Sequence, residues 1–135
     1  MYSTNHLVQF YETDLMQIVH HSNYLRIFEE ARVGWAQSVG LIDYQKPESA
    51  SLFAVIETHV THLKPCFFGE KLTIDLEVRL EGARVQFQYR LKGSLEVKAY
   101  GRTTHVALNS DLKPTRLSMQ MRNILKGEKW TETWL

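Results

Sequence analysis

The sequence has a single cysteine and no long apolar run. Cys66 cannot form an internal disulfide, and nothing else in the chain indicates an oxidising compartment. No apolar stretch approaches the roughly 20 residues that a transmembrane helix needs. The N-terminal stretch also lacks the basic and apolar regions of a secretory signal. We therefore expect a cytoplasmic protein without a membrane span.

The chain also has no large excess of charge of one sign, because its 16 Lys and Arg residues nearly balance its 15 Asp and Glu residues. A net charge of +1 creates no global field that would attract nucleic acid, so any anion-binding patch must be local. A Gly-rich phosphate loop, a dinucleotide-binding fingerprint and a serine nucleophile elbow are also missing from the sequence. We expect no nucleic-acid partner and no bound nucleotide cofactor.

The histidines do not form a metal-binding pattern. His20 and His21 are adjacent, and adjacent side chains of an extended segment point to opposite sides. His59, His62 and His105 lack the compact spacing of metal ligands. We therefore expect no metal.

What the chain does contain is typical of a small globular domain. Apolar residues make up 44% of the 135 residues and charged residues 23%, which predicts one folded domain over residues 1–135. Residues 71–80 and 84–92 alternate apolar and polar side chains around a Glu81-Gly82 turn. This alternation predicts antiparallel strands with one buried and one solvent-facing side. Further strands are predicted at residues 7–11, at 52–63 and from residue 95 onward.

One long helix is predicted from Ser22 or Asn23, either of which can cap it, to Gly40. Its apolar residues recur at helical spacing, namely Tyr24, Ile27, Phe28, Ala31, Trp35 and Val39. A shorter helix is predicted within residues 114–126. The fold class is therefore α+β, a five-stranded antiparallel sheet with one long helix on its apolar face. The edges of such a sheet favour a two-fold homodimer.

The stretch from Phe10 to Arg32 reads FYETDLMQIVHHSNYLRIFEEAR. It resembles the signature of the 4-hydroxybenzoyl-CoA thioesterase-like branch of the hot-dog superfamily, which includes the acyl-CoA thioesterases associated with the Tol-Pal system. The segments LKPCFFGEKLTI and GRTTHVAL extend the resemblance across most of the chain.

This resemblance implies a hot-dog fold, in which the antiparallel sheet wraps around one long central helix. It implies hydrolysis of an acyl-CoA or acyl-carrier-protein thioester to a free acid, with coenzyme A as part of the substrate and no further cofactor. It also implies a homodimer or homotetramer with its active site near the subunit boundary.

Asp14 is the main catalytic candidate because it lies in a predicted loop just before the long helix. The N–H groups at a helix N-terminus can stabilise the oxyanion that forms from a thioester carbonyl. A neighbouring carboxylate can attack the carbonyl or deprotonate a water. Without the family resemblance, Asp14 also fits the role of a structural aspartate in a turn. The resemblance implies Asp14 as nucleophile or general base and the His21 backbone N–H as oxyanion donor.

Four neighbours of Asp14 are further candidates. The His20 or the His21 side chain lines the site or else orients the loop. Asn23 caps the helix, fixes the Asp14 loop or contacts the substrate. Gln17 stands where the family usually has glycine, three residues after the catalytic aspartate. We expect Gln17 to affect the range of substrates more than the type of reaction.

Charged residues elsewhere allow two readings each. Glu29 is the alternative catalytic acid, or part of a solvated helix face with Arg26 and Arg32. Three basic residues of the predicted strands either bind the phosphates of CoA or simply face solvent, namely Arg84, Arg90 and Lys92. Lys64 is a weaker candidate for the same role.

Two other functions remain open from the sequence. The first is a hot-dog hydratase or dehydratase that acts on an enoyl thioester, although the motif from Glu12 to Tyr24 argues against it. The second is a non-catalytic protein that binds acyl-CoA or an acyl carrier. The acyl group itself is not predicted.

Overall fold

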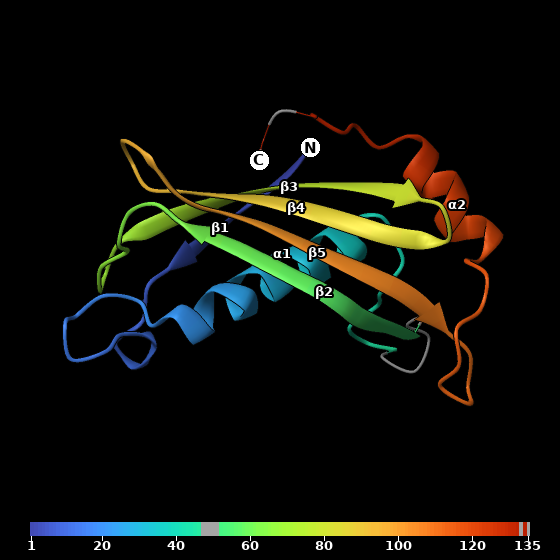
Figure 1. Ribbon diagram of the computed structural model, residues 1–135, viewed down its shortest axis with the longest axis horizontal. Coiled ribbons are helices and arrows are strands. Elements are labelled where there is room, and N and C mark those ends of the chain that lie inside the picture. Colours follow the sequence, from blue (N-terminus) through green and yellow to red (C-terminus); the bar gives the residue numbers. More distant parts are fainter. Residues whose placement is uncertain (47–51, 133, 135) are drawn as a thin grey trace.

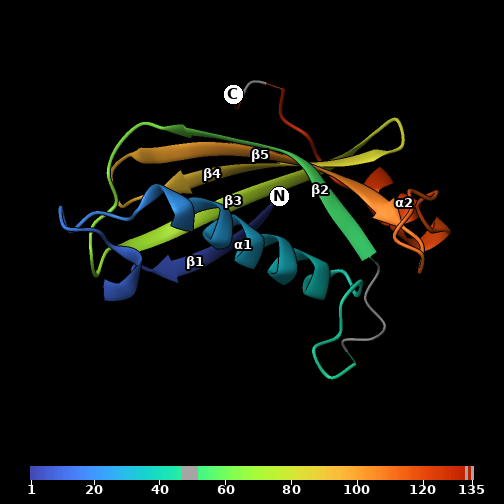
Figure 2. The same cartoon turned by 60° about the horizontal axis from the view of Figure 1, so that its bottom comes forward.

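Five strands and one long helix form the body of the protein in the computed structural model, which describes residues 1–46, 52–132 and 134. The strands are β1 (Tyr2–Leu7), β2 (Leu52–His62), β3 (Lys71–Glu81), β4 (Arg84–Lys92) and β5 (Val97–Leu108). They pair antiparallel in the order β1-β3-β4-β5-β2. Helix α1 (Tyr24–Ser38) lies across one face of the sheet (Figures 1 and 2). The predicted α+β class and five-stranded antiparallel sheet are confirmed.

Strand β4 has the predicted limits and β3 extends one residue past its predicted end, to Glu81, whereas the first strand lies elsewhere. The predicted strand at residues 7–11 is wrong, because β1 ends at Leu7 and residues Phe10–Glu12 form a short 3-10 helix, η1. Leu7 pairs with Lys71 at the end of the β1–β3 ladder. Beyond it the chain turns, and the Glu12 carboxylate accepts the Gln9 N–H at 2.8 Å.

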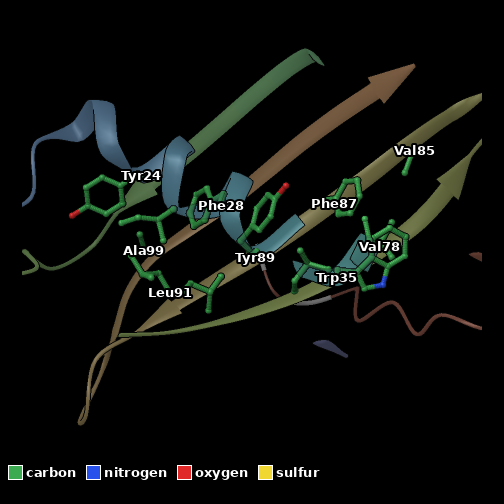
Figure 3. Packing of buried hydrophobic residues seen from close by; sticks show 14 of the residues in the cluster. Tyr24, Phe28, Trp35, Val78, Val85, Phe87, Tyr89, Leu91 and Ala99 are labelled. Atoms are coloured by element: carbon green, nitrogen blue, oxygen red, sulfur yellow. The ribbon is translucent and has the colours of Figure 1, made fainter. Parts of the chain in front are cut away.

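The core lies between α1 and the sheet, as Figure 3 shows. The Phe28 ring of α1 stacks on the Tyr89 ring of β4, with centroids 4.4 Å apart and planes 9° apart. Phe28 also rests on Gly101 of β5, where a Cβ atom would collide with its ring. Glycine at this position lets the helix approach the middle of the sheet closely.

The opposite face of the sheet is buried at its centre, contrary to the predicted solvent-facing side. Asp75 and Glu77 of β3 are each only 1% exposed. The C-terminal residues 128–132 and Trp134 lie over this outer face (Figure 2). Glu77 accepts hydrogen bonds from the Thr131 N–H at 2.7 Å and from the Gln88 side-chain amide at 2.9 Å. The strand alternation could not reveal this cover, because the covering residues lie more than 50 positions away in the sequence.

Helix α2 (Met119–Lys126) packs against β3 and is shorter than the predicted segment 114–126. It begins after Ser118, whose hydroxyl oxygen accepts the Met121 N–H at 3.1 Å. Such a side-chain cap fixes the start of the helix at this residue. None of the helices within the described ranges has the length and apolar character to cross a membrane.

Candidate functional site

Asp14 lies in a narrow loop that is closed by backbone hydrogen bonds. Its N–H donates to the Ile18 carbonyl at 3.0 Å, and its carbonyl accepts the Gln17 N–H at 2.9 Å. The Asp14 carboxylate accepts the Met16 N–H at 2.8 Å, which orients one of its oxygens. This loop lies beside the segment between β2 and β3, because Ile18 pairs with Phe67 (Figure 1).

Gln17 forms the sharp bend of this loop, with a backbone φ of +64°. A positive φ is costly for residues other than glycine because the Cβ atom crowds the backbone. Glycine, which has no Cβ atom, adopts such a φ without this cost. The Gln17 side chain is exposed, and within a single chain it does not line the cleft described below.

Asn23 ties the start of the helical region to the loop. Its side-chain amide donates to the Glu12 carbonyl at 2.9 Å, and the His20 N–H donates to the same oxygen at 2.9 Å. No side-chain hydrogen bond from Asn23 caps α1. Instead, a 3-10 turn, η2 (His21–Asn23), precedes the helix, and the His20 imidazole caps it by accepting the Ser22 N–H. Asn23 therefore joins the two ends of the Asp14 loop and does not cap α1 with its side chain.

The carboxylate of Glu12 supports the same region from within, since Glu12 is only 6% exposed. The Glu12 carboxylate accepts the Gln9 N–H, and its Oε1 lies 2.8 Å from Nε2 of His6. The other ring nitrogen of His6, Nδ1, lies 3.1 Å from Oε2 of Glu30 on α1. Glu12 thus links the Asp14 loop to β1 and, through His6, to the helix. Glu12 is therefore a buried acid that supports the loop.

Asp14 and the start of the helical region border one open cleft of about 430 Å³. The cleft is lined by Asp14, Ile18, Val19, His21, Tyr24, His62, Leu63, Lys64 and Pro65. The structure therefore brings Asp14 and His21 to the same cleft, together with the sequence candidate Lys64 and with His62 at the end of β2, which the sequence did not single out as a site residue. Among the described residues, the His21 backbone N–H has no hydrogen-bond acceptor.

The histidines of this region are close together. The His20 and His21 rings lie 4.1 Å apart and face one another at 34°, so the expectation that they point to opposite sides is wrong. The chain is not extended through this pair, because His20 caps the 3-10 turn that His21 begins. Burial, and then the neighbouring His21, hold the pKa of His62 below its usual value. His62 is therefore neutral at pH 7 and can donate or accept a hydrogen bond.

Tyr24 forms the wall of the cleft between the helix and the sheet. Its ring meets the His62 ring edge-on at 4.5 Å, and its hydroxyl donates to the Cys66 sulfur at 3.7 Å. Burial raises the pKa of Tyr24 and of Cys66 above their usual values. Both groups are therefore protonated at neutral pH, and the Cys66 thiol is not an activated nucleophile.

The other predicted site residues lie away from this cleft. On the outer face of the sheet, Arg90 and Lys92 bind Asp75 at 2.9 and 2.7 Å. Although burial alone would raise it, hydrogen bonds from Lys92, Ser3 and Arg90 hold the pKa of Asp75 below its usual value. Arg84 is exposed at the start of β4, and Glu29 borders a second cavity on α1. Of the basic residues named from the sequence, Lys64 is the one that lines the Asp14 cleft.

A family model described as the thioesterase-like superfamily matches residues 8–125. A relative from Aquifex aeolicus is 40% identical over 83 residues, which cover 61% of this chain and 63% of the relative, less than two thirds of its length. A protein of Nostoc punctiforme named 1,4-dihydroxy-2-naphthoyl-CoA hydrolase is 30% identical over 112 residues, which cover 81% of this chain and 75% of that protein. A solved structure of an Aquifex aeolicus protein without an assigned function superposes with a TM-score of 0.85 and 27% identity, covering 93% of this chain and 99% of that one.

Proposed function

The chain belongs to the thioesterase-like superfamily, and we propose that it hydrolyses acyl-CoA thioesters to a free acid and CoA with Asp14 as the catalytic carboxylate. One observation carries the proposal: Asp14 and His21 border the same cleft, and the His21 backbone N–H has no acceptor among the described residues. The narrower Tol-Pal-associated branch stays a prediction.

The chemistry follows from these two groups. The thioester carbonyl oxygen accepts the His21 N–H, which stabilises the negative charge that forms on this oxygen during attack. Asp14 either attacks the carbonyl carbon, forming an anhydride that water then hydrolyses, or takes a proton from the attacking water. In both routes the C–S bond breaks and the CoA sulfur leaves as a thiolate that takes up a proton.

Lys64 and His62 are placed to bind the CoA part of the substrate, which is the leaving group. Lys64 places a cation at the cleft, where it can bind a phosphate of CoA. His62 is neutral, borders the same cleft and can hydrogen bond to the pantetheine chain. A carrier protein that presents the same pantetheine thioester fits this arrangement equally well.

We also propose that the active unit is a homodimer formed through β2, or a homotetramer built from two such dimers. Strand β2 is at one edge of the sheet, and its residues 55–59 are all exposed. Val55 and Ile56 are 49% and 41% exposed, so the strand presents apolar side chains beside unpaired backbone groups. A second copy of β2 would pair with this edge and cover both.

The test is release of free thiol from a panel of aromatic, short-chain and long-chain acyl-CoAs. Aromatic thioesters come first because the Nostoc relative is named for one. We expect thiol release with at least one class. Hydration of an enoyl-CoA, followed by absorbance, would assign the protein to the hydratases instead. Tight acyl-CoA binding without thiol release would make it a binding protein.

A further inference from the structure

The loop between β2 and β3, residues 63–70, forms one side of the Asp14 cleft with its residues 63–65. Within this loop Lys64 is exposed, and it forms no ion pair with a carboxylate of the described residues. Its ammonium group is therefore available to a phosphate group of CoA. The position of the loop decides where this cation lies.

Lys98, the second residue of β5, holds the cleft side of this loop with three hydrogen bonds. Its carbonyl oxygen accepts the Leu63 N–H at 2.9 Å and the Lys64 N–H at 3.0 Å. Its Nζ donates to the Pro65 carbonyl at 3.0 Å. These contacts form because the end of β2 and the start of β5 lie at the same end of the sheet (Figure 1). One residue thus holds all three loop residues that line the cleft.

The ammonium group of Lys98 is buried, since Lys98 is only 6% exposed. It forms ion pairs with Glu70 at 3.2 Å and with Glu96 at 3.3 Å. Although burial alone would lower it, hydrogen bonds and charges of Glu70 and then Glu96 hold the pKa of Lys98 above its usual value. Lys98 is therefore charged at neutral pH. Its three N–H donors are all used, by Pro65 and the two carboxylates, so none is left for a substrate phosphate.

Glu70 ties the far end of the loop to the same lysine. Its Oε1 accepts the Phe67 N–H at 3.0 Å, while its Oε2 pairs with Lys98. Gly93, between β4 and β5, leaves the space that this pair needs. A Cβ atom at Gly93 would lie 2.6 Å from Cε of Lys98 and 2.7 Å from Oε2 of Glu70. Alanine at this position would therefore displace the ion pair without removing either charge.

The loop that carries Asp14 is held by other contacts. The Cys66 carbonyl accepts the Val19 N–H at 2.9 Å, and the side chain of Asn23 joins the two ends of the Asp14 segment. These bonds remain when the side chain of Lys98 is replaced, whereas the loop residues before Cys66 lose a support. Catalysis and CoA binding therefore depend on separate sets of contacts.

We propose that Lys98 is a positioning residue for CoA binding. It holds the β2–β3 loop so that Lys64 meets a phosphate of the substrate, and it does not touch the substrate itself. This inference rests on the proposed function, which supplies the CoA phosphates. It adds the buried residue on which the cation at the cleft depends.

The first test compares two thioesters of the same acyl group, one of CoA and one of N-acetylcysteamine, which has no phosphate. Lys98→Met should raise KM for the CoA thioester about three- to tenfold, as expected for one weakened hydrogen bond, and leave kcat nearly unchanged. Kinetics on the N-acetylcysteamine thioester should stay the same. Lys98→Arg, which keeps the charge, should restore part of the affinity. A higher KM or a lower kcat for both thioesters would show that Lys98 only stabilises the fold, and would overturn the proposal.

Three further variants sharpen this test. Lys64→Met should also raise KM for the CoA thioester alone, and adding Lys98→Met to it should cause little further loss, because both act through one contact. Fully additive losses would overturn the proposal. Gly93→Ala displaces the lysine without removing a charge, so it should give the same pattern even if Lys98→Met does not fold. Unchanged kinetics in Gly93→Ala would count against the positioning role. Lys126→Met, at an exposed position of α2, is the control and should behave as wild type.

Binding of CoA alone separates this inference from the proposed hydrolysis, because CoA has no acyl group to release. Calorimetry should show that Lys98→Met binds CoA about three- to tenfold more weakly than wild type, whereas both proteins bind pantetheine equally. Thiol release from acyl-CoAs with equal CoA affinity in the two proteins would overturn the inference and leave the proposed function intact. Weaker CoA binding by Lys98→Met in a protein that releases no thiol would support the inference and overturn the hydrolysis.

Discussion

The side-chain amide of Asn23 donates a 2.9 Å hydrogen bond to the carbonyl oxygen of Glu12, and this bond joins the two ends of the segment that carries Asp14. Asn23 is only 8% exposed, so water does not readily replace it there. The position of Asp14 relative to the His21 N–H therefore depends on a residue that touches neither.

Asn23→Ala should loosen this segment. Loss of a buried hydrogen bond costs about 1–3 kcal/mol in the free energy of unfolding, measured by urea denaturation. Turnover should fall as well, because Asp14 and the oxyanion donor lose their fixed spacing. Asn5→Ala, at an exposed position of β1, is the matched control and should change neither quantity much. A stable, fully active Asn23→Ala protein would show that the loop holds its shape without this bond.

Gln17→Gly should stabilise the protein, because glycine adopts the positive φ of this position without strain. The expected gain is about 1 kcal/mol, seen as a higher Tm. Gln17→Ala removes the same side chain but keeps the strain, so it should not raise Tm. A shift in relative rates among acyl-CoAs in both variants would assign substrate selection to the Gln17 side chain. Equal Tm values for the two variants would contradict the backbone interpretation.

The buried His105 should make the protein less stable in acid. Its pKa is about 4 when folded and about 6.5 when unfolded. Between these values the unfolded chain binds more protons, so the free energy of unfolding falls as the pH drops from about 6.5 to about 4. The contribution amounts to about 3 kcal/mol. His105→Gln cannot titrate, and its unfolding free energy should fall less over this range. Parallel pH profiles for the two proteins would exclude His105 as the cause.

Glu77→Gln tests the cover formed by the C-terminal segment. Both Glu77 oxygens accept hydrogen bonds, from the Thr131 N–H and from its hydroxyl, and an amide group can serve only one of these donors. We expect a loss of about 1–3 kcal/mol in unfolding free energy. Glu81→Gln, on the same strand but exposed, should cost far less. Equal small effects would mean that the segment contributes little to stability.

The sequence predicted those features that depend on neighbouring residues. The alternation from Leu72 to Leu91 located β3 and β4, and the helical spacing from Tyr24 to Trp35 located α1. The motif around Asp14 placed it beside the start of the helical region, where the structure shows the cleft.

Features that depend on distant residues could not be predicted in this way. The outer side of β3 reads as solvent-facing until Trp130 and Thr131 cover it. His62 joins Asp14 because the end of β2 folds beside the loop, and its distance from Asp14 in the sequence carries no signal of this. The apolar residues Phe10 and Tyr11 suggested a strand, but they are 74% and 81% exposed beyond the end of β1.

The most direct test of the central claim is the turnover of Asp14→Asn beside that of Glu29→Gln. Asparagine keeps the shape of the side chain but removes its charge, so turnover should fall by about 10²- to 10⁴-fold or more. Apparent substrate affinity should change little, since the acyl and phosphate contacts remain. Glu29→Gln should lose far less turnover. A folded Asp14→Asn protein that keeps more than about a tenth of wild-type turnover, well short of the expected loss, would remove Asp14 from the mechanism, and an inactive Glu29→Gln protein would then place the acid on the helix.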